Sequence, residues 1–308
     1  MNYTLHQLQI FLKVAELKSI TRASEELFLS QPAVSMQLKK FQEQFSIPLT
    51  EVIGRQLYVT EFGEEIAEAS ERILNEVEAI NYKTLSRQGQ LAGKLKIAIV
   101  STAKYAMPYF LTDFMTEHSG VDLVMDVTNK AEVIKSLENN EVDFAMVSVL
   151  PDHLNLNKIE LMQNKLFLVG GPTVETDNNK VTKRIFEKYP IIYREQGSAT
   201  RAAMENFLTN LNVPNKKKIE LKSNEALKQA LIAGLGVSIM PLIGLKNELK
   251  DEELHIIPYK NLPIKTNWNL IWLKSKKLSP VANAYLEFVN KEKTRIISNT
   301  FNWYEDYN

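Results

Sequence analysis

The sequence predicts an α/β protein in which a small helical unit precedes a larger unit of alternating strands and helices. Three patterns in the 308 residues carry this prediction. Short amphipathic helices fill residues 4–44, one long helix with an apolar stripe follows residue 60, and strands alternate with helices from Lys94 onward. Such alternation is typical of a mostly parallel sheet with helices on its faces.

The composition narrows the class of protein before any motif is considered. Hydrophobic residues make up 44% and charged residues 24%, which is ordinary for a soluble globular chain. The absence of cysteine excludes disulfides and thiolate metal sites and fits a reducing cytoplasm. The N-terminus lacks the features of a signal peptide, and no stretch approaches the roughly 20 apolar residues of a membrane helix. We therefore expect a cytoplasmic protein that does not bind membranes.

Three short helices are predicted at the N-terminus from apolar residues at helical spacing. In chain order, the first begins at Thr4, the second runs from Thr21 to Leu27, and the third runs from Gln31 to about Gln44. Ser19 or Thr21 can cap the second helix and Ser30 the third, whose first turn tolerates Pro32. Two short helices separated by such a turn are typical of a helix-turn-helix.

The third helix carries polar side chains that suit DNA, because Gln pairs with adenine and Lys reaches phosphate. Residues 1–60 hold 6 Lys and Arg against 5 Asp and Glu, so this prediction rests on pattern and not on net charge. A solvated helix face that contacts no DNA is the alternative. The polar residues of the face are Gln31, Ser35, Gln37, Lys39 and Lys40.

Residues 47–60 are expected to form a β-hairpin, the wing of the helix-turn-helix. They alternate apolar and polar side chains around a turn at Gly54 and Arg55. Arg55 is therefore placed to approach a DNA backbone or minor groove.

A long helix is predicted from Glu61 to about Ser86, with Thr60 as its cap. Its apolar stripe consists of Ile66, Ile73, Leu74, Val77 and Ile80. One isolated helix cannot bury that stripe, so the helix either packs on its own domain or pairs with a second copy. Pairing is favoured because residues 88–93 follow as a glycine-containing hinge.

From Lys94 the chain alternates between apolar strands and amphipathic helices, which predicts two successive α/β sets. The expected strands are Leu95–Val100, Asp122–Val127, Asp143–Val149, Lys165–Val169, Ile191–Tyr193, Lys218–Leu221, Val237–Met240 and Trp268–Leu273. The expected helices are Pro108–Glu117, Lys130–Asn139, one near Val181–Glu187, Thr200–Leu211, Glu225–Ala233 and Pro280–Lys291.

Sequence motifs of catalysis and metal binding are missing. The chain contains no G-x-S-x-G elbow, no G-x-x-x-x-G-K-[ST] loop and no H-E-x-x-H. Its four histidines show no ligand spacing, and Gly234 and Gly236 suit a helix-to-strand turn better than a nucleotide-binding loop. We predict no enzymatic activity, no metal and no cofactor. A solute-binding type of small-molecule binding protein, without regulatory DNA binding, is the alternative function.

Residues 8–65 resemble the helix-turn-helix of LysR-type transcriptional regulators through the SQPAVS opening of the third helix and the GRQLYVTEFGEE that leads into the long helix. The resemblance continues to near residue 293 through REQGSATR at 194–201 and SNEALKQALIAGLGVSIMP at 223–241. The segments VSTAKYAMPYFL and NKAEVIKSLENNEVDFAMV are most similar to the Calvin-cycle branch, the RuBisCO operon regulators.

The resemblance implies a winged helix-turn-helix at 1–60, a dimerisation helix and hinge at 61–93, and an effector domain at 94–308. The effector domain resembles a periplasmic binding protein, with a first lobe at 94–163 and 267–308 and a second lobe at 164–266. The implied partners are promoter DNA, a small anionic metabolite, further copies of the chain as a dimer or tetramer, and RNA polymerase.

The resemblance also implies the binding residues. For DNA they are Thr21, Arg22, Ser30, Gln31, Pro32, Ser35, Gln37, Lys39, Lys40 and Arg55. For the effector they are Ser101, Thr102, Lys104, Asn129, Ser148, Ser198, Thr200 and Arg201. Hydroxyls and helix N-termini would form a neutral, donor-rich cleft, with Lys104 and Arg201 as cations for a carboxylate or phosphate. The alternative for each hydroxyl is a helix cap.

Four positions depart from the family pattern. Thr50 and Val52 replace an aromatic residue and an arginine of the wing, which bears on whether the wing still contacts DNA. Thr128 and Ala199 replace glycines, and Ala199 would narrow the pocket.

Overall fold

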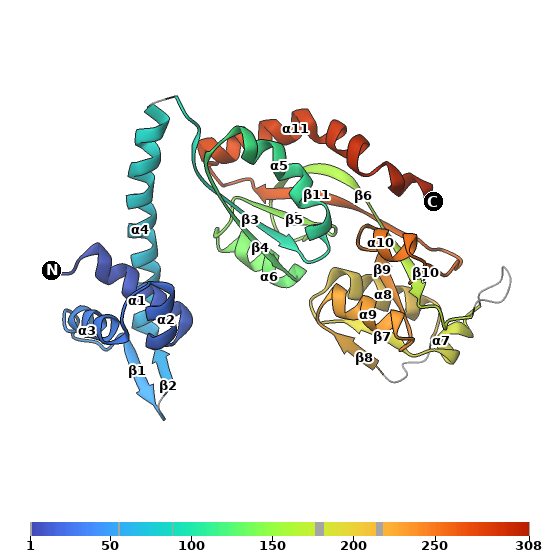
Figure 1. Ribbon diagram of the computed structural model, residues 1–308, viewed down its shortest axis with the longest axis horizontal. Coiled ribbons are helices and arrows are strands. Elements are labelled where there is room, and N and C mark those ends of the chain that lie inside the picture. Colours follow the sequence, from blue (N-terminus) through green and yellow to red (C-terminus); the bar gives the residue numbers. More distant parts are fainter. Residues whose placement is uncertain (1, 55, 88, 176–181, 214–217, 308) are drawn as a thin grey trace. The chain divides into compact units, whose positions relative to one another are not determined.

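The computed structural model describes residues 2–54, 56–87, 89–175, 182–213 and 218–307. The chain divides into two compact units, Met1–Gln90 and Leu91–Asn308 (Figure 1). The boundary falls within the expected hinge, three residues before Lys94.

The N-terminal unit is a three-helix cluster followed by a two-stranded hairpin and a long helix. Its elements are α1 (Leu5–Leu17), α2 (Ile20–Glu26), α3 (Gln31–Gln42), β1 (Thr50–Ile53), β2 (Gln56–Val59) and α4 (Glu61–Arg87). Phe11 and Phe41 are fully buried between α1 and α3, and Ile66 of α4 packs against the same core. The antiparallel pairing of β1 with β2 confirms the predicted wing.

Two of the predicted caps are present: the Ser19 side chain accepts from the N–H of Arg22, and the Thr60 side chain accepts from the N–H of Gly63. Thr4, predicted only as the start of the first helix, forms a capping box with Gln7. Ser30 is the N-cap residue of α3, as predicted, but its side chain makes no capping hydrogen bond. Its hydroxyl is exposed and therefore solvated instead.

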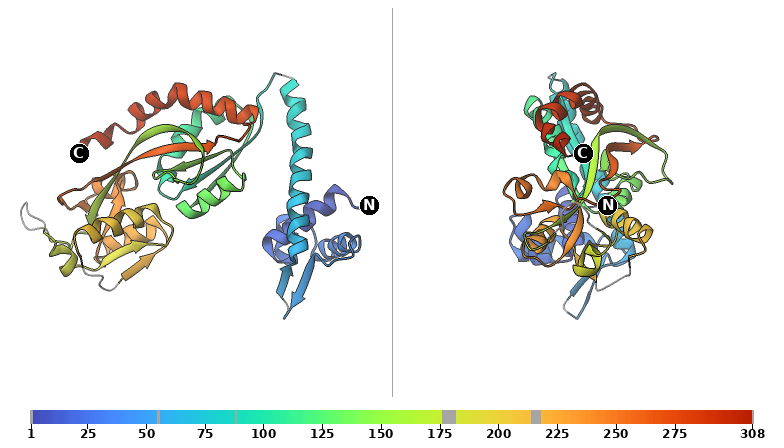
Figure 2. Two further views of the ribbon diagram at one scale, coloured as in Figure 1. Left: turned by 180° about the vertical axis from the view of Figure 1, so that it is seen from behind. Right: turned by 90° about the vertical axis from the view of Figure 1, so that its right-hand side faces the viewer.

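The C-terminal unit is a nine-stranded mixed sheet with helices on its faces (Figure 2). Its strands are β3 (Ala92–Val100), β4 (Gly120–Thr128), β5 (Phe144–Val147), β6 (Leu156–Gly170), β7 (Ile191–Arg194), β8 (Lys218–Leu221), β9 (Val237–Pro241), β10 (His255–Ile256) and β11 (Ile264–Leu273). Its helices are α5 (Met107–Glu117), α6 (Lys130–Glu138), α7 (Ile185–Lys188), α8 (Ala199–Asn210), α9 (Asn224–Ile232), α10 (Lys246–Lys250) and α11 (Pro280–Thr300), with 3-10 turns η1 (Ala103–Tyr105), η2 (Leu242–Gly244) and η3 (Asn302–Asp306).

Two long antiparallel strands, β6 and β11, cross the middle of the sheet. The strand order is β4-β3-β5-β11-β6-β9-β7-β8, with β10 paired to β6. The strands β3, β4 and β5 lie in the part of the chain predicted as the first lobe (94–163 and 267–308), and β7, β8 and β9 lie in the part predicted as the second lobe (164–266). β3 runs parallel to β4 and β5, as β7 does to β8 and β9, so the strand ends of each lobe face one edge.

The crossing strands are longer than predicted. β6 begins at Leu156 instead of Lys165, and β11 begins at Ile264 instead of Trp268. The added residues include polar ones that pair across the strands, such as Asn164, whose Nδ2 donates to Thr266 Oγ1 at 3.1 Å. Apolar periodicity alone could not identify them. The helix expected near Val181–Glu187 is observed as Ile185–Lys188, and residues 176–181 lie outside the described residues.

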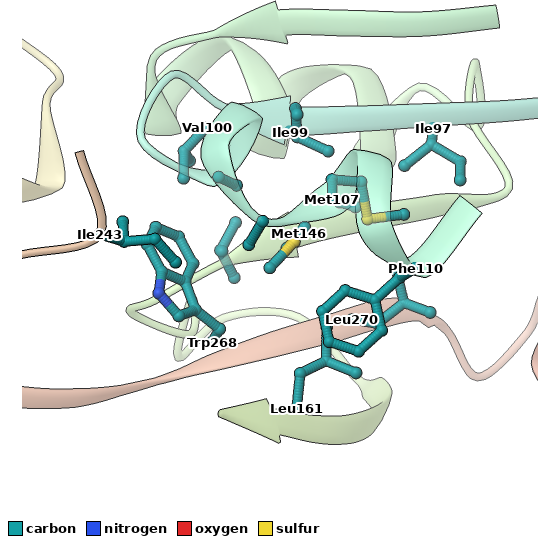
Figure 3. Close-up of a cluster of buried hydrophobic side chains, with 14 of the residues drawn as sticks. Ile97, Ile99, Val100, Met107, Phe110, Met146, Leu161, Ile243, Trp268 and Leu270 are labelled. Atoms are coloured by element: carbon teal, nitrogen blue, oxygen red, sulfur yellow. The ribbon is translucent and has the colours of Figure 1, made fainter. Parts of the chain in front are cut away.

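The main hydrophobic core of this unit lies between the sheet and helices α5 and α11. Trp268, Phe110 and Met107 are fully buried there together with Ile97 and Met146 (Figure 3). A second cluster, centred on Phe186, Val237 and Met204, stabilises the outer part of the second lobe. Within the residues that the structure describes, no helix is long and apolar enough to span a membrane.

Candidate DNA-binding surface and effector cleft

The helix-turn-helix exposes most of the residues predicted to contact DNA. Seven of them are exposed, and Ser35 and Gln37 are half-buried. The exposed residues are Thr21, Arg22, Ser30, Gln31, Pro32, Lys39 and Lys40. Arg55 lies outside the described residues, so its contact stays a prediction. Gln31 and Pro32 open α3, and Lys39 and Lys40 lie in its last turn.

Gln37 requires a correction, because it is not part of the free polar face. Its Oε1 accepts a hydrogen bond from Nε2 of Gln7 at 3.1 Å, which joins α3 to α1. Gln31 is exposed and thus remains the better placed of the two glutamines for reading a base.

Thr50 has a structural contact that explains one departure from the family pattern. Its Oγ1 donates to Gln42 Oε1 at 2.7 Å and its backbone N–H donates to the same oxygen at 3.1 Å. The side chain therefore holds the wing to the end of α3. Val52, the other substituted wing position, is 70% exposed.

Sequence reasoning missed Phe28, which lies in the turn between α2 and α3. Its side chain is 95% exposed and its φ is +53°, in the left-handed region that non-glycine residues rarely adopt. A short turn between two helices gives no periodicity from which this exposure could be predicted. An aromatic ring is thus presented beside the N-terminus of α3.

The apolar stripe of α4 is divided between the core and the surface. Ile66 and Leu74 pack against the core of the N-terminal unit. Ile73 and Ile80 are 41% and 61% exposed. Only part of the stripe is therefore buried within its own chain.

In the C-terminal unit, the predicted effector residues follow the ends of parallel strands. Ser101 and Thr102 follow β3, Asn129 follows β4, Ser148 follows β5, and Ser198 and Thr200 begin α8 after β7. Residues from the two lobes meet: a Cβ added at Gly197 would lie 3.1 Å from Asn129 Oδ1. Gly197 has φ +86°, so only a residue without a side chain both adopts this turn and leaves that space open.

Two of these polar residues act as helix caps. Asn129 Oδ1 accepts from the N–H of Glu132 at 3.1 Å, and Ser198 Oγ accepts from the N–H of Arg201 at 3.4 Å. Thr102 makes no side-chain cap, although it is only 6% exposed. The alternative prediction, that these polar residues are helix caps, therefore holds for Asn129 and Ser198 but not for Thr102.

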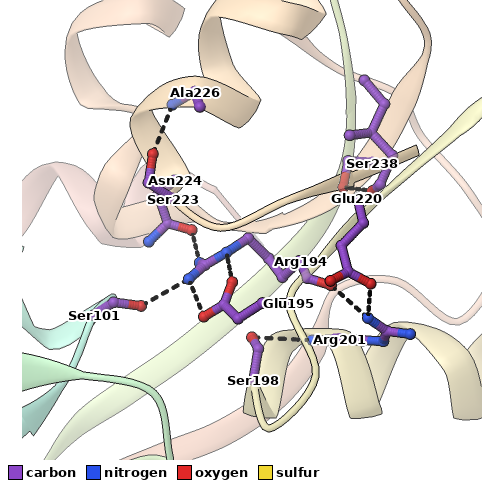
Figure 4. A network of polar contacts seen from close by, with 11 residues as sticks. Ser101, Arg194, Glu195, Ser198, Arg201, Glu220, Ser223, Asn224, Ala226 and Ser238 are labelled. Atoms are coloured by element: carbon purple, nitrogen blue, oxygen red, sulfur yellow. Dashed lines mark hydrogen bonds and ion pairs between the residues drawn. The ribbon is translucent and has the colours of Figure 1, made fainter. Parts of the chain in front are cut away.

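A buried arginine that sequence reasoning missed lies at this edge of the sheet. Arg194, 2% exposed, ends β7 and forms two hydrogen bonds to the Glu195 carboxylate at 2.8 and 2.9 Å (Figure 4). It also donates to Asn224 Oδ1, and its Nη2 donates to Ser101 Oγ of the first lobe at 3.0 Å. The guanidinium therefore bridges the lobes.

Asn224 leaves one hydrogen-bond donor of this network unused. Its side chain is 2% exposed, and its Nδ2 is buried without a partner in the described structure. A buried donor without an acceptor costs about 1–3 kcal/mol. An acceptor beside Asn224 would recover that cost.

The cations predicted for the effector are already paired with carboxylates. Arg201 contacts Glu205 at 3.0 Å and Glu220 at 2.6 Å, and Lys104 contacts Glu225 at 2.9 Å. The helix and strand ends therefore bring ion pairs, including Arg194 with Glu195, beside the predicted hydroxyls.

Glu225 forms a second bridge between the lobes. Its carboxylate accepts from the Tyr105 hydroxyl at 2.5 Å and contacts Lys104 of the first lobe and Lys228 of its own helix. Burial would raise the pKa of Glu225, but hydrogen bonds from Lys228, Tyr105 and Lys104 outweigh it and hold the pKa at about 2.

A cavity of about 670 Å³ opens beside the 196–199 turn. Ser198 and Arg201 line it together with Lys130 of the first lobe. Burial lowers the pKa of Lys130, because the charged form loses solvation there. No cluster of three or more metal-ligating side chains occurs in the described parts of the chain.

Two family profiles match the chain. Residues 5–64 match the bacterial regulatory helix-turn-helix protein, lysR family, and residues 88–293 match the LysR substrate binding domain. Together with the winged helix-turn-helix and the two-lobed sheet, these matches define a DNA-binding transcription regulator with an effector-binding domain. The chain belongs to the LysR family of bacterial regulators.

Curated relatives cover nearly the whole chain. The transcriptional activator CmpR of Synechocystis sp. is 34% identical over 94% of this chain and 95% of its own length. The RuBisCO operon transcriptional regulator of Allochromatium vinosum is 34% identical over 96% and 98%. The predicted resemblance to the RuBisCO operon regulators is thereby confirmed.

Two solved structures extend the comparison. The regulatory domain of Synechocystis CcmR in complex with 2-phosphoglycolate (2-PG) is 30% identical, with a TM-score of 0.60 over 68% of this chain and 98% of that one. Full-length CbnR in complex with its target DNA shares the fold at 19% identity, with a TM-score of 0.69 over 94% and 99%. The alternative of a solute-binding protein without DNA binding is contradicted by the helix-turn-helix match.

Proposed function

We propose that this regulator binds a small phosphorylated carboxylate, of the 2-PG type, between its two lobes and thereby changes its binding to a promoter. The observation that carries the proposal is the unused Nδ2 donor of Asn224 beside the buried guanidinium of Arg194. An anion there would accept charge-assisted hydrogen bonds, which are roughly twice as strong as neutral ones. The 2-PG complex of CcmR supports this ligand class.

The first-lobe hydroxyls would complete the site. Ser101 accepts from Arg194 through a lone pair, so its O–H is a donor for a ligand oxygen that takes the place of Ser101 on the guanidinium. Thr102, which has no capping contact, would donate as well. Ligand binding would then exchange a direct contact between the lobes for one through the ligand.

The proposal is tested by titrating the full-length protein with 2-PG in a thermal-shift assay. A ligand that binds only the folded state raises the melting temperature. Glycolate and inorganic phosphate, each holding half of the 2-PG chemistry, are the matched controls. A shift with 2-PG that exceeds the shift with either control supports the site, and equal shifts contradict it.

We propose that the active form is a homo-oligomer in which α4 pairs two copies on an interrupted palindrome. The exposed Ile73 and Ile80 support this pairing. RNA polymerase is the further partner, and the cytoplasm, where promoter DNA lies, is the place of action. The proposed function uses the cleft for binding and not for catalysis.

A further inference from the structure

Lys165 is a buried cation in the crossing strand β6, and its partners come from the last residues of the chain. Its side chain is 2% exposed. Nζ donates to the carbonyl oxygens of Tyr304 and Tyr307 at 3.1 and 2.8 Å, and the backbone N–H donates to the Tyr304 hydroxyl at 3.1 Å. That hydroxyl also accepts from the N–H of Ile243, which follows β9. A buried ammonium is costly without hydrogen-bond acceptors. The last residues of the chain therefore supply the acceptors that Lys165 of β6 needs.

The C-terminal segment, residues 301–307, ends the first lobe and packs both against that lobe and against the second. Phe301 packs edge-on against Tyr109 of α5 in the first lobe, with ring centroids 5.5 Å apart. The ammonium of Lys246, in α10 of the second lobe, lies 5.6 Å from the ring centroid of Trp303. One short segment thus joins the first lobe, the crossing strand and the second lobe.

We infer that residues 301–307 form a bracket that fixes the spacing of the two lobes, and that Lys165 is a positioning residue for the effector response. A ligand shifts an equilibrium only through its different affinity for two states. Contacts that join three parts of the fold stabilise the arrangement in which all are made. The link to the effector rests on the proposed function, whereas the effect on lobe spacing does not.

Two changes, one in Lys165 and one in its partners, test whether the hydrogen bonds of the ammonium, and not packing alone, hold the C-terminal segment in place. Lys165→Met removes the ammonium and keeps a long apolar side chain. Deletion of residues 304–308 removes the carbonyl acceptors of the ammonium. Because only the Lys165 background has those hydrogen bonds to lose, the deletion should lower the melting temperature more there than in the Lys165→Met background.

Lys293→Met is the matched control. Lys293 also donates its Nζ to a backbone carbonyl, that of Glu160, at 3.1 Å, but both residues belong to the first lobe. Tyr304→Phe is a milder variant, because it removes only the hydroxyl that accepts from Lys165 and Ile243. If the deletion variant fails to fold, Tyr304→Phe still tests the inference.

Lobe spacing can be measured without any ligand. The chain has no cysteine, so spin labels at Lys135→Cys on α6 and Gln229→Cys on α9 report the distance between the lobes in the full-length protein, diluted with unlabelled chain. We expect the distance distribution to shift or broaden in Lys165→Met, Tyr304→Phe and the deletion, and to stay unchanged in Lys293→Met. In the same variants the 2-PG midpoint for operator binding should shift by about 2- to 30-fold, the range for residues that couple sites without touching the ligand.

Unchanged lobe distances in all three bracket variants would overturn the inference, whatever 2-PG does. An equal change of the lobe distance in Lys293→Met would also overturn the inference. The change would then follow from the loss of any lysine that binds a backbone carbonyl, and not from the loss of the bracket. A wild-type protein that ignores 2-PG contradicts the proposed function, while the distances still decide on the bracket.

Discussion

Asn224 is the residue whose substitution tests the proposed effector site most directly. Asn224→Asp replaces the unused Nδ2 donor by a carboxylate oxygen while still offering an acceptor to Arg194. We expect binding of 2-PG to weaken by about 10-fold or more, because a like charge would face the anion. Calorimetric titration measures the change. Asn290→Asp, at an exposed position of α11, is the charge-matched control, and equal losses in both variants would contradict the assignment.

The depressed pKa of Glu225 predicts a pH dependence of stability. A carboxyl whose folded pKa of about 2 lies below its ordinary 4.5 contributes stability above pH 4.5, and this contribution is lost as pH falls toward 2. The side chain is 51% exposed, so solvent screening reduces the contribution to about 1 kcal/mol. Melting temperatures of wild type and Glu225→Gln should therefore differ at pH 5 and converge near pH 2. A constant difference across this range would refute the bridge.

Some binding residues could be predicted at this scale and others could not. Ser101, Asn129 and Ser198 were predicted through the family resemblance, and the fold places them just after the parallel strands β3, β4 and β7. Arg194 was missed because an arginine at the end of a short strand is usually solvated, and only the fold shows Asn224 and Ser101 beside it.

At the scale of single elements, different residues of α3 are predicted to contact the bases and the phosphates of DNA. Gln31→Ala should lower operator affinity by about 1–3 kcal/mol for a lost base contact. Lys40→Ala should weaken binding to every sequence and reduce its salt dependence. Fluorescence anisotropy with operator and random duplexes at several salt concentrations distinguishes the two effects. Equal affinity of both variants and wild type for the operator would disprove this docking.

The linker helix α4 offers a paired test of association. Ile73→Asp places a charge on the exposed apolar stripe, which a helix pair would bury at high cost. Asn75→Asp adds the same charge two residues away, about 200° around the helix, at an exposed position. We expect light scattering to show a smaller oligomer for Ile73→Asp alone. If its mass equals that of Asn75→Asp, the interface lies elsewhere.

Elements with strong apolar periodicity were predicted within a few residues, whereas polar continuations were not. α4 was expected to end near Ser86 and ends at Arg87. α11 was expected to end at Lys291 but continues to Thr300, because Ile296 remains buried while its neighbours turn polar. The start of β6 was missed for the same reason, because its first residues mix polar and apolar side chains.

At the scale of the whole molecule, DNA recognition and effector sensing lie in separate compact units of one chain. Sequence alone predicted this organisation, because helical periodicity in the first 87 residues changes to strand and helix alternation afterwards. It could not predict the contacts that join the two lobes, since Arg194 with Ser101 and Glu225 with Tyr105 are far apart in the chain. Those contacts are what a ligand would change.

Operator binding measured against 2-PG concentration tests the central claim most directly. The account predicts that 2-PG changes the operator affinity of the wild type, and that Thr102→Ala, Ser148→Ala and Thr200→Ala keep effector-free DNA binding and melting temperature. Each should weaken the effect of 2-PG by roughly 0.5–1.5 kcal/mol, the net value of one hydrogen bond. Wild-type midpoints in all three variants and in Asn224→Asp would contradict the account and leave these side chains with structural roles only.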